Sequence, residues 1–260
     1  MEIEIWAHRG RLVPSLPGNT LLDFLEVSKL GIHGIETDIC FTAPNKDGSQ
    51  QPIIHHPNPK YPDDPSNIKW SHFKFRPKIK VLCLDNFLIF LSTHPNLFCF
   101  LEPKENNEKL MGVIVQKIAE YGLEDRIYLT VYQLRIPFLG LETSANLISK
   151  ARAQNPKIRI HIIATLPFYL PALVRKYNPE AISFGWLPES KLSIWFFKIF
   201  LLRFVNLKRQ IKQVQDMGVK VIGGIVNNKE GFEYFTDLGV DGIMTDNPIA
   251  AMEFIKTKSP

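Results

Sequence analysis

Eight short apolar runs, separated by longer stretches of helical periodicity, most restrict how this chain of 260 residues can fold. Several of the longer stretches end in glycine, as a helix does before the next strand. Eight strands that alternate with helices in about 250 residues predict a parallel (β/α)8 barrel, or TIM barrel, with a doubly wound open sheet as the alternative. The expected strands are residues 3–7, 34–39, 97–104, 126–131, 158–164, 180–185, 219–226 and 240–245, and the clearest helical stretches are 19–31, 107–122 and 207–218.

Composition favours a single domain over residues 1–260. The chain is 45% hydrophobic and 22% charged, which is enough apolar material for a sizeable core, and no linker-like stretch divides it. A net charge of +5 suits an anionic substrate or a membrane surface. The three cysteines have no CxxC spacing, so neither a disulfide framework nor a structural zinc site is expected. The first residues lack the pattern of a secretory signal, which makes a cytoplasmic location the expectation.

Two stretches interrupt the regular alternation. Residues 41–96 are too long for one barrel connection and contain a predicted β-hairpin with a glycine in its turn. Within them, residues 67–80 interleave basic and aromatic side chains, which we interpret as a basic cover over an anionic-substrate cleft rather than a nucleic-acid site. Residues 187–205 are unusually apolar but too short to span a membrane, which takes roughly 20 apolar residues.

Charged side chains gather where the first three predicted strands end. In a parallel barrel these ends meet at one rim, where active sites lie. Residues two apart in a strand face the same side, and charged groups are rarely buried without a partner or an ion. The sequence therefore indicates a site at this rim. It comprises His8 and Arg9 after the first strand, Glu36 and Asp38 in the second, and Glu102 and Lys104 at the end of the third.

The residue types at this rim suggest their chemistry. Three carboxylates, Glu36, Asp38 and Glu102, favour a hard divalent cation, Mg²⁺ or Ca²⁺, over zinc. Arg9 and Lys104 suit a phosphate group beside that metal. A histidine near such a site can move protons. Together these residues point to cleavage of a phosphodiester.

Short motifs along nearly the whole chain carry a family resemblance. They are AHRG at 7–10, PGNT at 17–20, ETD at 36–38, HH at 55–56, LEPK at 101–104 and LGVDGIMTDNP at 238–248. In order and spacing they resemble the glycerophosphodiester phosphodiesterase family. The resemblance implies a (β/α)8 barrel with a small insertion after the second strand. It also implies metal-dependent hydrolysis of glycerophosphodiesters to glycerol phosphate and an alcohol such as choline or ethanolamine.

The resemblance carries residue roles with it. It implies a general base and a general acid, His8 and His55, which would take a proton from the attacking group and protonate the departing alkoxide. The attacking group would be water, or the neighbouring glycerol hydroxyl through a cyclic phosphate. The metal ligands would be Glu36, Asp38 and Glu102, and the phosphate-binding residues Arg9 and Lys104.

The chain departs from the family pattern at two positions. Gly18 stands where the family usually has glutamate, and His56 where it usually has aspartate. Neighbouring residues of an extended segment face opposite ways, so His55 is expected to face the site and His56 away from it. His56 and Asn19 are candidates for supporting the site residues. Asn19 serves equally as a helix cap, and Asp246 is expected to serve barrel closure more than the site.

Residues 187–205 leave two further functions open. Within them, 192–205 form either a helix buried against the barrel or a surface for an acyl chain or a bilayer interface. The second interpretation predicts a lysophospholipase D with peripheral membrane contact. A catalytically weakened barrel that binds lipid or phosphodiester is the other alternative, suggested by Gly18 and His56. A small-molecule substrate is expected throughout, and no nucleic acid.

Overall fold

The structure is a computed structural model. It describes the chain apart from residues 1–2, 59, 76–80, 133–145, 166, 187–190, 196, 198, 200–204 and 259–260.

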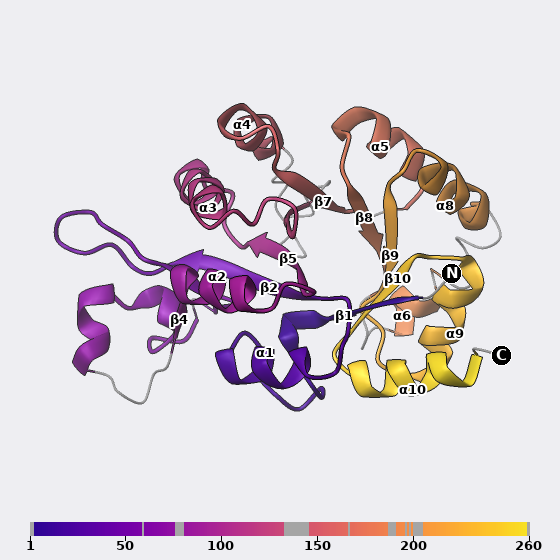
Figure 1. Ribbon diagram of the computed structural model, residues 1–260, viewed down its shortest axis with the longest axis horizontal. Coiled ribbons are helices and arrows are strands. Elements are labelled where there is room, and N and C mark those ends of the chain that lie inside the picture. Colours follow the sequence, from indigo (N-terminus) through magenta and orange to yellow (C-terminus); the bar gives the residue numbers. More distant parts are fainter. Residues whose placement is uncertain are drawn as a thin grey trace.

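A closed barrel of eight parallel strands, surrounded by helices, forms the body of the described chain (Figure 1). The strand β1 pairs with β10 on one side and with β2 on the other, which closes the ring. The predicted barrel is therefore confirmed, and the open doubly wound sheet is excluded. The barrel strands are β1 Glu4–Ala7, β2 Gly34–Phe41, β5 Phe98–Pro103, β6 Ile127–Tyr132, β7 Arg159–Ile163, β8 Ala181–Phe184, β9 Lys220–Gly223 and β10 Gly242–Thr245.

Helices follow the strands and bury their apolar faces against the barrel. The three predicted helical stretches correspond to α1, α3 and α8, and each begins after a side chain that caps its first turn: Thr20, Asn107 and Asn206. The helices of the described residues are α1 Leu21–Ser28, α2 Leu84–Thr93, α3 Glu108–Glu120, α4 Leu147–Gln154, α5 Leu170–Tyr177, α6 Lys191–Trp195, α8 Leu207–Asp216, α9 Lys229–Leu238 and α10 Pro248–Lys258. Short 3-10 turns are η1 His8–Gly10, η2 Pro65–Asn67 and η3 Trp70–Phe75.

The long connection after β2 contains the predicted hairpin, which projects from the barrel (Figure 1). The end of β2 pairs antiparallel with β3, Pro52–Ile54, which in turn pairs with β4, Leu82–Cys83. Gly48 lies in the turn with a φ of 79°, a conformation that favours glycine. The chain then returns through α2, whose Phe87 and Phe90 pack against Phe24 of α1.

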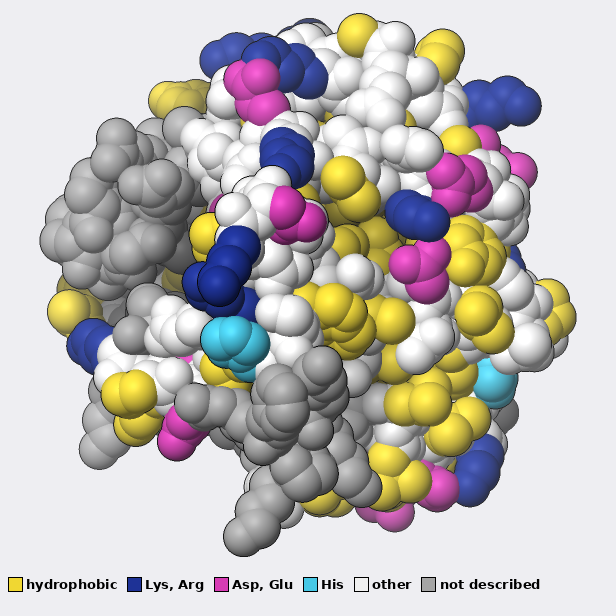
Figure 2. Space-filling view, turned by 90° about the vertical axis from the view of Figure 1, so that its left-hand side faces the viewer, with side chains coloured by type: hydrophobic (Ala, Val, Ile, Leu, Met, Phe, Trp, Pro, Cys, Tyr) yellow, Lys and Arg dark blue, Asp and Glu magenta, His cyan; other side chains and the backbone are white. Residues whose placement is uncertain are grey.

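The basic and aromatic stretch at 67–80 packs against the hairpin. Lys69 forms an isolated parallel β-bridge with Ala43 through the backbone. The Ser71 hydroxyl donates to the side chain of Asn45 at 2.9 Å. Figure 2 looks at the molecule from the hairpin's side and shows lysine and arginine side chains among larger hydrophobic areas. Residues 76–80 of this stretch lie outside the described chain, so its function as a cover over the cleft stays a prediction.

Aromatic rings fill the barrel beneath the polar rim. Trp6 stacks on Phe100 with 3.8 Å between ring centroids, and His161 lies 4.0 Å from the other side of Phe100. Phe100 precedes Glu102 by two residues in β5, so both face the barrel interior. The rim residues therefore stand on a packed floor, which restricts their movement.

The apolar segment at 187–205 is described only in part. Its helix α6 is followed by Phe197, which packs against Phe184 and Trp186. By contrast Leu192 is 75% exposed, and Trp195 and Ile199 are each 52% exposed. The described part thus combines one buried aromatic anchor with an outward apolar side. Among the described residues, no helix has the length and apolar character needed to cross a membrane.

Candidate active site

Three acidic side chains meet at the carboxyl ends of β2 and β5. Asp38 lies opposite Glu102 in the parallel register, and Glu36 precedes Asp38 by two residues on the same side. One oxygen of each lies within 4.8 Å of the others, and all three residues are buried. Clustered carboxylate oxygens are the ligands that Mg²⁺ and Ca²⁺ prefer. We call these three residues the acidic triad, and they could hold a divalent metal ion.

Within the acidic triad, Glu36 is the carboxyl group that is least compensated by its neighbours. Its Oε1 atom is buried and has no hydrogen-bond partner among the described residues. Burial raises the pKa of Glu36 well above its usual value, and the charges of Asp38 and Glu102 raise it further. A buried anion with an unpaired oxygen is costly unless a cation compensates it. The residues present therefore fit a metal ion.

Two basic side chains flank the acidic triad. The Lys104 ammonium lies 3.3 Å from Asp38 Oδ1 and also pairs with Glu102. Arg9 Nε lies 3.1 Å from Asp38 Oδ2, an ion pair without hydrogen-bond geometry. Burial works to raise the pKa of Asp38, but Lys104 and Arg9 outweigh it and lower that pKa to about 2. Asp38 is therefore ionised at neutral pH.

The loop before α1 supports the acidic triad through Asn19. Its amide nitrogen donates to Asp38 Oδ2 at 2.8 Å, and its carbonyl oxygen accepts from the Thr37 hydroxyl at 2.7 Å. The alternative role of Asn19 as a helix cap is wrong, because Thr20 accepts the hydrogen bond from Asp23 N that caps α1. Asn19 instead fixes the orientation of a metal-ligand candidate.

His8 lies between the acidic triad and the end of β10. Its Nδ1 atom is 2.7 Å from Asp246 Oδ1, and its Nε2 atom is 3.7 Å from Glu36 Oε2. Asp246 was expected to serve mainly barrel closure, and the structure instead pairs it directly with the proposed base. The motif that contains Asp246 was visible in the sequence, but the contact depends on closure of the barrel between β1 and β10.

The two adjacent histidines have different surroundings. His55 Nε2 bonds to Asp64 Oδ2 at 3.0 Å, and Asp64 is buried within the insertion. Burial lowers the pKa of His56 to about 4, and the charges that act on it most are those of Asp38, Lys104 and Arg9. Of the two adjacent histidines, His56 is therefore the one whose pKa responds to Asp38 of the acidic triad. His55 is engaged by Asp64, which sequence reasoning did not identify.

Tyr132 is a further residue that sequence reasoning missed. It ends β6, and its ring centroid lies 5.9 Å from Lys104 Nζ. Burial raises the pKa of its hydroxyl, and Glu102 raises it further. Its place at the end of a predicted strand was the available signal, the same one that identified Glu102 and Lys104.

The glycine at position 18 leaves no room for a larger residue. Its φ is 75°, and an added Cβ would lie 2.6 Å from Arg9 Cβ and 2.8 Å from the Arg9 carbonyl oxygen. Glycine at position 18, where the resemblance leads one to expect glutamate, is thus required by the close approach of Arg9.

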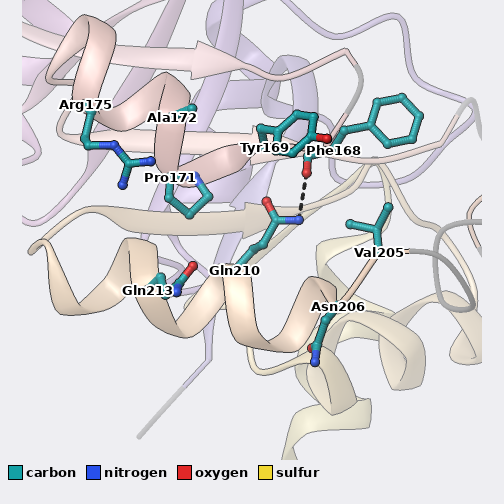
Figure 3. A pocket seen from close by; sticks show the side chains of 9 residues that line it. All are labelled: Phe168, Tyr169, Pro171, Ala172, Arg175, Val205, Asn206, Gln210 and Gln213. Atoms are coloured by element: carbon teal, nitrogen blue, oxygen red, sulfur yellow. Dashed lines mark hydrogen bonds between the residues drawn. The ribbon is translucent and has the colours of Figure 1, made fainter.

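A separate pocket of about 450 Å³ lies between α5 and α8 (Figure 3). Gln210 crosses it, accepting from Leu170 N and donating to the Phe168 carbonyl oxygen, both at 2.8 Å. Val205, the last residue of the apolar segment, also lines it. The acidic triad is not part of its wall.

The chain is similar in sequence to curated proteins and in fold to solved structures. No protein-family model matches the chain. The chain is 26% identical over 179 residues to lysophospholipase D GDPD3 of Mus musculus, covering 60% of this chain and 48% of the relative. The chain therefore spans about half the length of that curated relative.

Solved structures show the same fold. A glycerophosphodiester phosphodiesterase of Parabacteroides distasonis superposes with a TM-score of 0.74 at 15% identity, over 100% of this chain and 99% of the other. A phosphodiesterase of Oleispira antarctica, solved with the product sn-glycerol-3-phosphate, gives 0.66 at 16% identity, over 98% and 97%. The barrel of this chain is therefore the fold of these solved phosphodiesterases.

Proposed function

We propose that this protein hydrolyses glycerophosphodiesters to glycerol phosphate and an alcohol. The observation that carries the proposal is the buried acidic triad with its unpaired Glu36 oxygen, flanked by Arg9, Lys104 and His8. Such a site combines positions for a cation, for a phosphate and for proton transfer. The names of the structural neighbours support the same substrate class.

In this proposal the acidic triad would hold one divalent cation, Mg²⁺ or Ca²⁺. When bound, the cation would offset the charge that develops on the phosphoryl oxygens. Asn19 would keep Asp38 in place through the hydrogen bond at 2.8 Å. The unpaired Oε1 of Glu36 supports this assignment, because it is the triad oxygen most in need of a positive partner.

Arg9 and Lys104 would bind the phosphate. Both are anchored by Asp38, and Lys104 also by Glu102, so their positive charges are held at the rim before substrate arrives. Preorganised charge of this kind stabilises a transition state without the cost of rearrangement. A planar guanidinium beside an ammonium can contact different oxygens of one phosphate.

Two histidines would move the protons. His8 would accept a proton from the attacking water, or from the neighbouring glycerol hydroxyl if a cyclic phosphate forms first. A second histidine would protonate the departing alkoxide. The resemblance implied that role for His55, whereas the charges of Asp38, Lys104 and Arg9 that act on His56 favour His56. Burial lowers the pKa of His56 to about 4, and a bound phosphodiester anion would act in the opposite direction.

Phosphorus NMR of the purified protein tests the proposal. Glycerophosphocholine is supplied with Mg²⁺, with Ca²⁺ or with chelator, and we expect glycerol phosphate only where a metal is present. A cyclic phosphate intermediate would show as a separate resonance. A folded protein that turns over no glycerophosphodiester under any of these conditions would favour a barrel that only binds such compounds.

A second candidate is lysophospholipase D activity with peripheral membrane contact. It is favoured by the exposed apolar side chains of Leu192, Trp195 and Ile199, and by the name of the curated relative. Trp195→Glu should then reduce turnover of lysophosphatidylcholine far more than that of glycerophosphocholine. Ile89→Glu is the matched control, since Ile89 is 50% exposed on α2. Equal losses on both substrates would contradict the lipid specificity.

A further inference from the structure

Asp246 and His8 lie side by side at the carboxyl ends of two paired strands, β10 and β1. Ala7 of β1 lies opposite Thr245 of β10 in the parallel register, and His8 and Asp246 are the residues that follow each strand. Their side chains meet at 2.7 Å between Nδ1 and Oδ1. Because the two positions are 238 residues apart, only closure of the barrel brings them together.

The carboxylate of Asp246 is itself held from two further directions. Asn227 donates to Oδ2 at 2.9 Å and accepts from the Asp246 backbone N–H at 2.8 Å. Arg11 donates to Oδ1 at 2.8 Å and also to the Pro17 carbonyl oxygen at 3.2 Å. Asp246 is only 7% exposed. Asn227 and Arg11 therefore fix the position of the Asp246 carboxylate, and its Oδ1 atom also contacts His8.

The charge of this carboxylate decides which way the bond to His8 runs. Burial works to raise the pKa of Asp246, but His8, Asn227 and Arg11 outweigh it and lower that pKa to about 2. An ionised carboxylate accepts hydrogen bonds and donates none. The hydrogen atom must therefore sit on His8 Nδ1. In a neutral imidazole, the lone pair then lies on Nε2, the atom 3.7 Å from Glu36 Oε2.

We propose that Asp246, held by Asn227 and Arg11, is a positioning residue that sets the tautomer and orientation of His8, so that Nε2 faces the acidic triad as the proton acceptor. This inference rests on the proposed function for its kinetic consequence, but the tautomer itself does not. Without Asp246, an imidazole can protonate either nitrogen and rotate, which would leave a fraction of His8 unable to accept the proton.

Nitrogen NMR tests the tautomer directly. The full chain is labelled with ¹⁵N-histidine, loaded with Mg²⁺ and measured at about pH 8, where an ordinary imidazole is neutral. The His8 signals are identified by their loss in His8→Gln. We expect Nδ1 to resonate as a protonated nitrogen and Nε2 as an unprotonated one. In Asp246→Asn we expect this pattern to reverse or to become a mixture, while the other histidines keep their signals.

Steady-state kinetics with glycerophosphocholine tests the consequence. Asp246→Asn should lower kcat by about 100-fold or more with little change in KM, since general-base catalysis contributes about 10²–10⁴-fold. Asp246→Glu should recover part of the rate. Asp241→Asn is the matched control, because Asp241 bonds Val221 N at 2.7 Å at the other end of β10 and should affect thermal stability only.

Two results would overturn the inference. One is a wild-type His8 protonated at Nε2. The other is a folded Asp246→Asn variant that keeps the wild-type tautomer and rate. If the wild-type protein hydrolyses no phosphodiester, the proposed function fails, and the nitrogen spectra still decide whether Asp246 sets the tautomer of His8.

Discussion

Both ends of the barrel carry buried or half-buried acidic groups, but the charged partners of these groups differ. At the amino end, Glu4 pairs with His33 at 2.8 Å and with Lys220, and it accepts from Trp6 Nε1 at 3.1 Å. Burial opposes ionisation of Glu4, but these partners outweigh it and lower its pKa. At the carboxyl end, one oxygen of Glu36 has no hydrogen-bond partner in the described part of the chain, and the pKa of Glu36 is raised.

The opposite pKa shifts distinguish the ion-pair network around Glu4 from the acidic triad, where Glu36 remains uncompensated. Glu4 already has its compensating charges within the protein, so its network needs nothing further. Glu36 shares the charge of Lys104 with Asp38 and Glu102, and its bond from the Arg9 backbone N–H does not offset its burial. Unfavourable electrostatics of this kind gather at functional sites, where a ligand relieves them.

The strongest way to break this comparison is Glu36→Gln. It removes a proposed metal ligand, so metal-dependent turnover should fall to the rate measured in chelator. Although the variant should lose activity, its folded state should gain stability. A carboxylate whose folded pKa is raised destabilises the folded protein above its unfolded pKa, so at neutral pH in chelator the variant should melt higher than the parent. Full activity in Glu36→Gln would refute the assignment of the acidic triad.

The two adjacent histidines sharpen the assignment of the carboxyl end. His56→Gln should lower kcat by about 100-fold, the lower range for loss of a proton donor. His55→Gln should cost mainly stability, because His55 bonds Asp64. The same phosphorus NMR assay measures both. The reverse order of losses would restore His55 as the general acid.

Metal addition should distinguish the two ends by thermal melting. A ligand at 100 times its Kd stabilises a folded protein by about 2.7 kcal/mol, which raises Tm by roughly 5–10 °C for a chain of this size. We expect this shift with Mg²⁺ or Ca²⁺ in the wild-type protein and in Glu4→Gln, and its loss in Glu36→Gln. A shift that survives in Glu36→Gln would mean that the metal binds elsewhere.

Gly18→Ala tests how tightly the loop beside Arg9 is fitted. A left-handed φ of 75° costs an ordinary residue about 1–2 kcal/mol, and contact with Arg9 at 2.6 Å adds to this. Gly48→Ala is the matched control, with a similar φ of 79° and no atom within 4 Å of the added Cβ. We expect Gly18→Ala to lose more stability by urea unfolding and to lower turnover, which Gly48→Ala should leave unchanged.

The smallest effect is expected at the amino end. Glu4→Gln should destabilise the protein by about 1 kcal/mol at neutral pH without changing turnover. A carboxylate with a lowered folded pKa contributes stability above its unfolded pKa, which is lost as pH falls through the folded value. The difference between variant and parent in urea unfolding should therefore vanish in acid. A turnover defect in Glu4→Gln would show that the two ends are coupled.

Much of the fold could be predicted because the barrel repeats one local pattern. Each of the predicted strands corresponds to a barrel strand, and glycine or a capping side chain marks helix ends such as those of α1 and α9. The acidic triad was also predictable, since Glu36 and Asp38 share a side within one strand and Glu102 ends the neighbouring one. These features depend on spacing within a strand or on neighbouring strands.

Contacts between distant segments could not be predicted in the same way. The bond between Asp64 and His55 depends on the path of an irregular insertion. Alternation in an extended segment predicts that adjacent side chains diverge, but not which of the two points inward. The partner of His55, Asp64, comes from the insertion and lies nine residues further along the chain.

The sequence by itself determined the barrel, its hairpin and the acidic residues of its rim, because all of these follow from local periodicity and from alternation along strands. Only the tertiary structure decided that Asp246 holds His8, that Asn19 supports Asp38 rather than capping α1, and that His55 is engaged by Asp64. The physical reason is that closure of the barrel and folding of the insertion create short contacts between groups far apart in the chain. The distances between charged groups then determine which of them form ion pairs.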